Sequence, residues 1–425
     1  MSIRKLYLPF AIILLFGVSP ALGQAAHSPF SSFGLGEQFG TALIPSQGMG
    51  GVGISNPEYW HLNSQNPALL IFNRFTTFQA GMLGEQRNQT SATTSEKSGS
   101  GNLAYLALGI PLKPGKWGTS VSLTPFTRLN YQLKYTSPIQ GDPTNTVSIT
   151  EEGTGGINAF GISTGVAITK KISVGVRANY LFSSIQNTFT SSLTATTQTL
   201  LIFPRIIERT YISDFQFTPA ISFHKDSLFN KNYQFNIGFV YDVKANLHAK
   251  FHQTVERRNI GNLIDSTTLI SNQPGIVTIP SSLSGGISFG RAYHWIAAID
   301  GSYSDYSDYV DLSGTNPYQS KNWRVAAGYS FTPDPTSLSS YLRRATYRTG
   351  VSLENYPYLV NGNTVKDFGI TFGLSLPVSR ISRLDLALKV GKKGDKTLNT
   401  IEENYLKLYF GLTFNDQWFI KRRFD

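Results

Sequence analysis

Strict alternation of apolar and polar residues is the feature that most limits the folds open to this chain. In YLKLYFGLTF, residues 405–414, every even position is leucine or phenylalanine, whereas the odd positions are tyrosine, lysine, glycine or threonine. Successive side chains of a β-strand point to opposite faces, so a period of two predicts a strand with one apolar face. The same split recurs in segments that begin at Ile172, Phe235 and Leu384. We therefore expect a chain built mainly from strands.

Fourteen segments of this kind follow one another, and their connections alternate in length. Long polar stretches such as 85–100 and 253–272 alternate with short turns such as KPGK at 113–116. Short turns at one rim and long loops at the other are typical of outer-membrane β-barrels. The predicted strands begin near Arg74, Gly101, Trp117, Thr150, Ile172, Arg205, Tyr233, Gly275, His294, Lys321, Ala345, Thr364, Ser382 and Glu403.

A soluble β-sandwich is the competing fold, because its strands also alternate. Sandwich strands are usually about 5 to 6 residues long, whereas these segments run to roughly 10 to 20 residues, enough to cross a membrane at a tilt. Lipid offers no partner to an unpaired amide, so a spanning sheet must close on itself. We therefore predict an all-β fold: a transmembrane 14-stranded antiparallel β-barrel over residues 74–414.

Composition agrees with this fold and excludes several other classes of protein. Only 15% of residues are charged, against about 25% in soluble domains. The net charge of +11 is scattered without a basic block, so no nucleic-acid partner is expected. Cysteine is absent and the six histidines form no ligand cluster. We expect no metal site and no cofactor.

The first residues have the composition of an export signal. Arg4 and Lys5 precede an apolar core over residues 6–18, and small residues follow at 21 and 23. The core is too short to span a bilayer. We predict a signal peptide over residues 1–23, export to the outer membrane of a Gram-negative bacterium, and a periplasmic tail over residues 415–425.

The segment 24–73 precedes the first strand and has neither helical nor strand periodicity. Its sequence GMGGVGIS includes Gly48, Gly50 and Gly51, and Asn66-Pro67-Ala68 follows. Glycine, asparagine and proline favour tight turns. Because wall side chains cannot fill a barrel of fourteen strands, we predict that this segment is an N-terminal hatch inside the lumen.

These motifs, in their order along the chain, resemble those of the FadL-type outer-membrane transporters of long-chain fatty acids and other hydrophobic compounds. The matching stretches are SQNPALL (64–70), EGTGGINAFGISTGVAI (152–168) and IPSSLSGGISF (279–289), with similar hairpins near the end of the chain. The resemblance implies uptake of a hydrophobic small molecule, fatty-acid-like or detergent-like, across the outer membrane. It also implies an apolar pocket within the barrel, and exit into membrane lipid where the third strand kinks.

Pro125 is the candidate for that lateral opening, because it lies inside the predicted third strand. Proline cannot donate to the strand ladder, so it favours a bulge or a break. The alternative is a proline near the outer rim, where pairing already frays.

Inward-pointing cations are the candidates for ligand binding. Arg177, Arg324, Arg348 and Lys407 lie on the polar faces of predicted strands. An arginine could hold a carboxylate by paired hydrogen bonds. Alternatively, these side chains pair across the lumen or anchor the hatch.

Two other functions compete with transport. An outer-membrane enzyme would need a Ser/His or Asp/His arrangement, but no motif surrounds His224, His248 or His252, so we expect no catalytic residue. A FadL-like barrel could instead serve as a partner or shuttle protein in an outer-membrane secretion or assembly complex. A protein partner in the outer membrane therefore stays open, beside the hydrophobic ligand and membrane lipid.

Overall fold

A computed structural model describes residues 27–139, 142–193, 203–228, 233–259, 262–312, 314–318, 321–379 and 381–417. The predicted signal peptide and residues 418–425 of the predicted tail lie outside this described part. No helix within it is long and apolar enough to cross a membrane.

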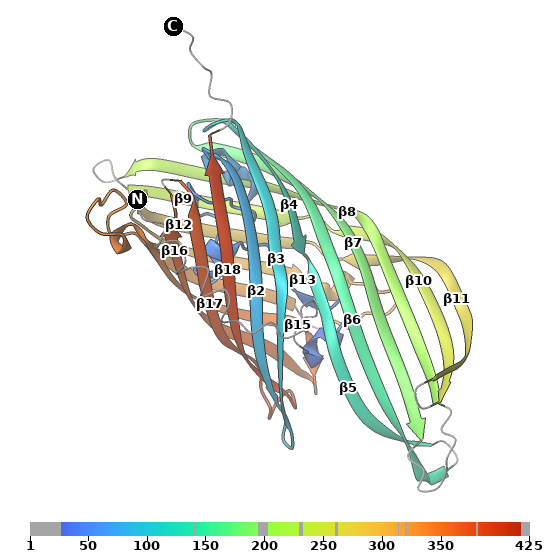
Figure 1. The fold of residues 1–425 in the computed structure, drawn as a ribbon. Coiled ribbons are helices and arrows are strands. Elements are labelled where there is room, and N and C mark those ends of the chain that lie inside the picture. Colours follow the sequence, from blue (N-terminus) through green and yellow to red (C-terminus); the bar gives the residue numbers. More distant parts are fainter. Residues whose placement is uncertain are drawn as a thin grey trace.

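The strands from β2 to β18 form one antiparallel sheet that closes where β18 pairs with β2 (Figure 1). Three wall strands are each interrupted: β4 continues as β5 after Phe126, β9 as β10 after 243–244, and β11 as β12 after 280–281. The wall therefore has fourteen strands, and the predicted 14-stranded barrel is confirmed. The bounds are β2 (Thr76–Thr90), β3 (Ser95–Lys113), β4 (Trp117–Pro125), β5 (Thr127–Ile139), β6 (Asp142–Ala167), β7 (Ile172–Leu193), β8 (Phe203–Leu228), β9 (Tyr233–Asp242), β10 (Ala245–Asn259), β11 (Asn262–Ile279), β12 (Ser282–Arg291), β13 (Trp295–Asp305), β14 (Lys321–Phe331), β15 (Thr346–Val360), β16 (Asn363–Pro377), β17 (Arg383–Gly394) and β18 (Glu402–Asp416), with short 3-10 turns η4 (Tyr306–Asp308) and η5 (Leu342–Arg344) between strands.

The alternation seen in the sequence separates the outer face of the wall from the inner face. In β18, Leu408 and Phe414 on the apolar face are 45% and 52% exposed, whereas Tyr405 and Tyr409 on the other face are buried. Large apolar side chains are exposed in this way on nearly every wall strand. Such an outward apolar band is the surface that a barrel presents to lipid.

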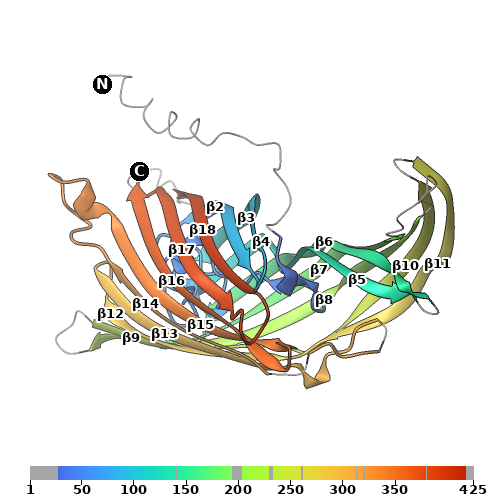
Figure 2. The same cartoon turned by 90° about the horizontal axis from the view of Figure 1, so that it is seen from below.

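Six strands, β5 to β8, β10 and β11, continue beyond the others at one end of the barrel (Figure 1). Figure 2 shows the same strands as a curved sheet that rises past the rest of the wall. We call this sheet the outer extension: β5 and residues 142–154, 186–193, 203–212, 245–259 and 262–279. It lies at the rim opposite to the short turns, which is the extracellular rim in barrels of this kind.

Two of the long connections expected to be loops are strands instead. The polar stretches 85–100 and 253–272 are mostly strand, in the hairpins β2–β3 and β10–β11, so β3, β6 and β11 begin earlier than expected. In water neither face of a strand has to be apolar, so the period of two is lost while the backbone pairing continues.

Residues 27–73, called the hatch below, lie within the barrel (Figure 1). They contain η2 (Pro29–Ser32), β1 (Glu37–Gln38), α2 (Ile44–Gln47) and η3 (Pro67–Phe72), and the helical turns contact wall strands on opposite sides: η3 contacts β4, β6, β7 and β8, and α2 contacts β16, β17 and β18.

Glycines of the wall allow the hatch to come this close. A Cβ atom on Gly328 would lie 2.2 Å from the carbonyl oxygen of Met49, and one on Gly118 would lie 2.4 Å from that of Leu70. Apart from Gly394, whose Cβ atom would meet the Phe30 ring, ten wall glycines on ten different strands would each place a Cβ atom within 3.0 Å of a hatch atom. We call them the glycine girdle: Gly81, Gly109, Gly118, Gly165, Gly175, Gly238, Gly328, Gly350, Gly373 and Gly411.

The glycine girdle predicts that a single methyl group loosens the hatch. We expect Gly328→Ala to lower the stability of the docked hatch by about 1–3 kcal/mol, because the new Cβ atom overlaps backbone. Gly301→Ala is the matched control, since its Cβ atom would have no neighbour closer than 3.9 Å. The measurement is the rate of protease cleavage within the hatch in both purified variants. Equal rates would contradict the prediction.

Candidate functional site

The third wall strand is broken at the predicted position. β4 ends at Pro125, Phe126 separates it from β5, and the amide of Phe126 donates to the carbonyl of Ile157 at 2.8 Å. Opposite the break, Gly155 and Gly156 of β6 have φ of +112° and +143°, which only glycine adopts readily. A proline on one strand and two glycines on the next therefore produce the local bend. Whether Pro125 opens the wall to a ligand stays a prediction.

Past this break, pairing across the wall stops. The β3–β4 register reaches Leu106 and Leu123 in that direction, and β5 has only β6 and the two-residue β1 as paired neighbours in the described chain. The Arg128 guanidinium of β5 donates to the Asn102 side chain at 3.1 Å and to the Leu103 carbonyl of β3 at 3.0 Å. A side chain therefore replaces the backbone ladder at this point, which we call the wall opening.

A cavity of about 300 Å³ lies between the hatch and the wall, and Pro125 and Phe126 form part of its lining. Polar residues make up most of the rest of that lining, and nine of them are charged. The charged residues are Glu37, Arg177, Asp242, Asp300, Arg324, Glu354, Asp367, Lys389 and Lys407. The resemblance implied an apolar pocket, and this cavity is polar instead.

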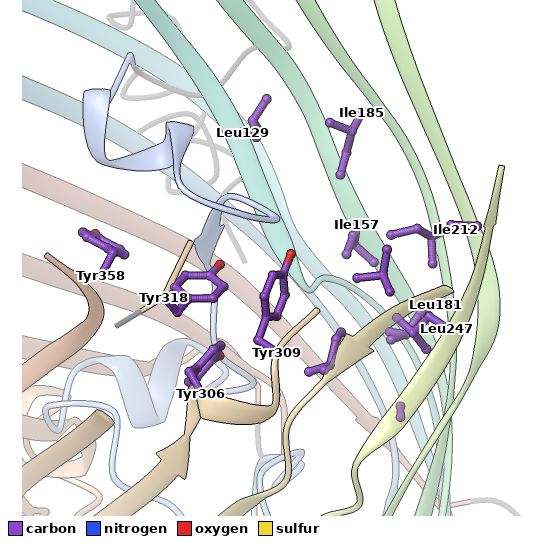
Figure 3. Close-up of a cluster of buried hydrophobic side chains, with 14 of the residues drawn as sticks. Leu129, Ile157, Leu181, Ile185, Ile212, Leu247, Tyr306, Tyr309, Tyr318 and Tyr358 are labelled. Carbon is purple, nitrogen blue, oxygen red and sulfur yellow. The ribbon is translucent and has the colours of Figure 1, made fainter. Parts of the chain in front are cut away.

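Apolar inward residues form a packed cluster at the base of the outer extension. Leu181 and Ile157 have no exposed surface, and Figure 3 shows them on the strands facing Tyr306, Tyr309 and Tyr318. The tyrosines lie in and after η4, and Tyr318 packs edge-on against Tyr309 at 4.6 Å between ring centroids. The cluster stabilises the wall, and its members Ala159, Ile279, Tyr306 and Tyr356 also line the cavity.

The hatch motif makes the contacts that hold the hatch in shape and in place. The Asn66 side chain accepts from the amide of Ala68 at 2.9 Å and so caps η3, and it donates to the carbonyl of Ile54 at 2.6 Å. Pro67 approaches Gly165, and the Gly50 amide donates to Thr371 at 2.7 Å. The remaining glycines of the motif pack against the wall: Gly48 against Gly373 and Gly51 against Arg324.

All four predicted ligand-binding cations have partners in the hatch or on neighbouring strands. Arg177 donates to the carbonyl of Ser64 and lies 3.5 Å from Asp242, and Arg324 donates to the carbonyl of Gly50. Lys407 lies 3.3 Å from Glu85, and Arg348 donates to Ser375. Arg177, Arg324 and Lys407 line the cavity, whereas Arg348 faces a smaller pocket beside Trp295 and Arg383.

A buried charge cluster between hatch and wall was not foreseen from the sequence. The Arg87 guanidinium contacts Glu37 of the hatch at 2.8 Å, Glu85 at 2.7 Å and Glu403 at 3.0 Å. Lys393 adds a contact to Glu37 at 3.4 Å. Arg87 and Glu85 fell in a stretch expected to be a loop, so their inward direction had no periodic signal.

A second ionic contact fixes the other side of the hatch. His61 is buried, with its ring nitrogens 3.0 Å from Asp385 of β17 and 3.4 Å from Glu58. Burial lowers the pKa of His61, but the charge and hydrogen bonds of Asp385 and Glu58 outweigh burial and raise that pKa above its ordinary value. The hatch is thus bound more tightly when His61 is protonated.

This contact predicts a pH dependence of hatch docking. Because the pKa of His61 is raised in the folded protein, its contribution is complete below about pH 6.5 and is lost as the pH rises through the raised value. We expect protease cleavage of the hatch to accelerate as the pH rises above about 6.5. His61→Gln should remove this acceleration, and an unchanged pH profile in that variant would refute the assignment.

The histidines considered for catalysis lie outside the lining of the cavity, and two of them contact an aspartate. His248 is on the exposed surface of β10, 2.6 Å from Asp214, and His224 contacts Asn236 and Asp226. Within the described ranges, no group of three or more His, Asp or Glu residues could hold a metal ion.

Comparisons with known proteins agree with this description. A family model described as BamG matches residues 2–425. No curated protein matches the sequence. Solved structures with the same fold include the toluene transporter TodX of P. putida (14% identity, 90% of this chain and 99% of that chain, TM-score 0.57). Two others are the toluene transporter TbuX of Ralstonia pickettii (14%, 89% and 99%, TM-score 0.55) and a Pseudomonas aeruginosa FadL homologue (11%, 89% and 98%, TM-score 0.54). The resemblance to FadL-type barrels is therefore confirmed for the fold.

Proposed function

The chain belongs to the BamG family, and from this membership, its fold and its wall opening we propose that it is an outer-membrane channel for small hydrophobic molecules. The ligand enters from outside, occupies the space beside the hatch and leaves sideways into lipid. Solved barrels of the same fold are described as transporters of toluene and as a FadL homologue, which supports this class of ligand.

The wall opening is the observation that carries the proposal. Pro125 lines the lumenal cavity and also a second depression of about 260 Å³, which Thr127, Gly155 and Gly156 help to form on the other side of the break. The bend at Phe126 is therefore the place where the cavity comes nearest to a gap in the backbone ladder. A hydrophobic molecule can leave a barrel sideways only at such a gap, because intact neighbouring strands are hydrogen-bonded along their length.

Within this class we propose an amphipathic ligand with an acidic head, such as a long-chain fatty acid, which would compete with the five carboxylates of the lining for its four cations. Arg177, Arg324 and Lys407 face the cavity, and a carboxylate can form paired, charge-assisted hydrogen bonds with an arginine. The apolar chain would extend through the wall opening towards lipid. A molecule without a polar group would gain nothing from this lining, because buried charges favour water or a polar partner.

Pro125→Ala tests the wall opening. Alanine restores a backbone donor and frees φ, so the strand can continue across the break, and we expect uptake of a radiolabelled long-chain fatty acid to fall roughly threefold or more. The control is Pro219→Ala, which changes a proline inside β8 away from the break. Equal uptake by the two variants would remove the lateral route, and no uptake by the unmodified protein would remove the channel proposal itself.

A second candidate is the role of partner protein in an outer-membrane complex, and the fixed hatch favours it. The glycine girdle and the contacts of Arg87 and His61 hold the hatch against the wall on several sides. Such a barrel works as a rigid scaffold whether or not a ligand passes through it. Purification in mild detergent from its native membrane distinguishes the two roles: bound fatty acid supports the channel, and a protein at equal molar amount supports the scaffold.

A further inference from the structure

Two strand edges of the outer extension are unpaired along most of their length. In the described part of the chain, β11 pairs only with β10 up to Val277, and β5 pairs beyond Asn130 only with β6. The edge of β5 faces that of β3, which pairs with β2 but with no other described strand over 95–105. We call the space between residues 95–101 of β3 and 131–137 of β5 the wall notch. It begins at the wall opening and extends outwards beyond it.

The two edges differ in how well they are protected from pairing. The β10–β11 register shifts at three places, Asn272 has a positive φ of 51°, and Pro274 removes a donor. Bulges and prolines of this kind blunt an edge strand. β5 has its proline and its register shift only at its outer end, at Pro138, and its register with β6 is regular from Leu129 up to that residue. One edge is therefore protected by its sequence, and the other is left able to pair.

The hatch already uses the first positions of the β5 edge. β1 pairs with Thr127 and Arg128, the amide of Ser28 donates to the Asn130 carbonyl at 2.9 Å, and the Asn130 amide donates to the Ser31 hydroxyl at 3.1 Å. In an antiparallel ladder the direction of the backbone groups alternates. The N–H and C=O groups of Gln132, Lys134 and Thr136 therefore point the same way as those of Asn130, into the wall notch.

We propose that the wall notch binds an extended strand of a partner protein, which pairs with the β5 edge from Gln132 to Thr136. The inference gives the scaffold role its contact surface and does not depend on ligand passage. The notch admits a strand rather than the edge of a second copy, because β2–β3 of the same chain stands on its other side. Its base is wider than one strand spacing of about 4.8 Å, since the Arg128 side chain spans it.

The side chains around the notch indicate the composition of that strand. Leu133 and the 47% exposed Tyr135 lie on the inner face of β5, with Tyr131 below them. Lys134 on β5 and Lys97 on β3 are exposed on the outer face. Cross-strand neighbours of matching character stabilise a sheet. The partner strand is thus expected to alternate apolar residues facing inwards with acidic residues facing outwards.

Hydrogen–deuterium exchange of the full-length protein tests the inference without knowledge of the partner. In native outer membranes, the amides of Gln132, Lys134 and Thr136 should exchange at least about tenfold more slowly than in the purified protein. Amides on the blunted β11 edge, such as Thr268 opposite Thr254, should exchange alike in both samples. Equally fast exchange of the β5 amides in both samples would overturn the proposal.

A pair of variants identifies backbone pairing as the cause. Lys134→Pro removes a backbone donor from the edge and blocks pairing of an added strand, whereas Lys134→Ala keeps the amide. In native membranes, a partner protein should therefore still cross-link to β5 in the alanine variant but not in the proline variant. Gln132→Pro repeats the test if Lys134→Pro does not fold, with folding judged by resistance to unfolding in detergent. Loss in both Lys134 variants, retention in both, or a cross-linked product made of two copies of this chain would each overturn the proposal.

Discussion

Backbone groups cannot stay unpaired in lipid, and most of this structure follows from that constraint. The sheet closes through β18 and β2, and among the described residues its pairing lapses along the outer part of β11 and after Phe126. At Phe126 other groups of the same chain take over: β1 pairs with the start of β5, and Arg128 donates to the Leu103 carbonyl. The hatch therefore completes the wall as well as occupying the lumen.

The width of the barrel explains why a hatch is needed and why it packs directly on the wall. Fourteen strands enclose more space than wall side chains can fill, and a hatch of turns has many backbone groups to satisfy. The glycine girdle lets those turns lie directly on the wall, where Gly50 donates to Thr371 and Asp300 accepts from the amides of Gly53 and Ile54. Fixed contacts of this kind favour a rigid hatch over one that swings out.

Periodicity predicted the part of the wall that lies in lipid, because only there does one face have to be apolar. Four strands begin at the predicted residue: Trp117, Ile172, Tyr233 and Lys321. β11, by contrast, begins at Asn262 rather than near Gly275, since strands of the outer extension are solvated on both faces. The break at Pro125 had a local signal in proline chemistry. The contacts of Arg87 had none, because they join residues that are far apart in the chain and follow from the closed barrel.

The interior of this barrel shows that a shared fold does not determine the chemistry of the lumen. The chain shares its architecture with hydrocarbon transporters at 14% identity, and identical architecture permits different chemistry inside. Here many apolar inward residues pack among themselves beside Tyr309, and the open space is lined mainly by polar and charged groups. Because an unpaired buried charge is costly, those groups were kept in contact with the hatch, with each other or with water. The break at Phe126 therefore underlies both proposals. Beside the cavity it interrupts the backbone ladder where a ligand would leave, and further out it leaves the edge of β5 open to a partner strand.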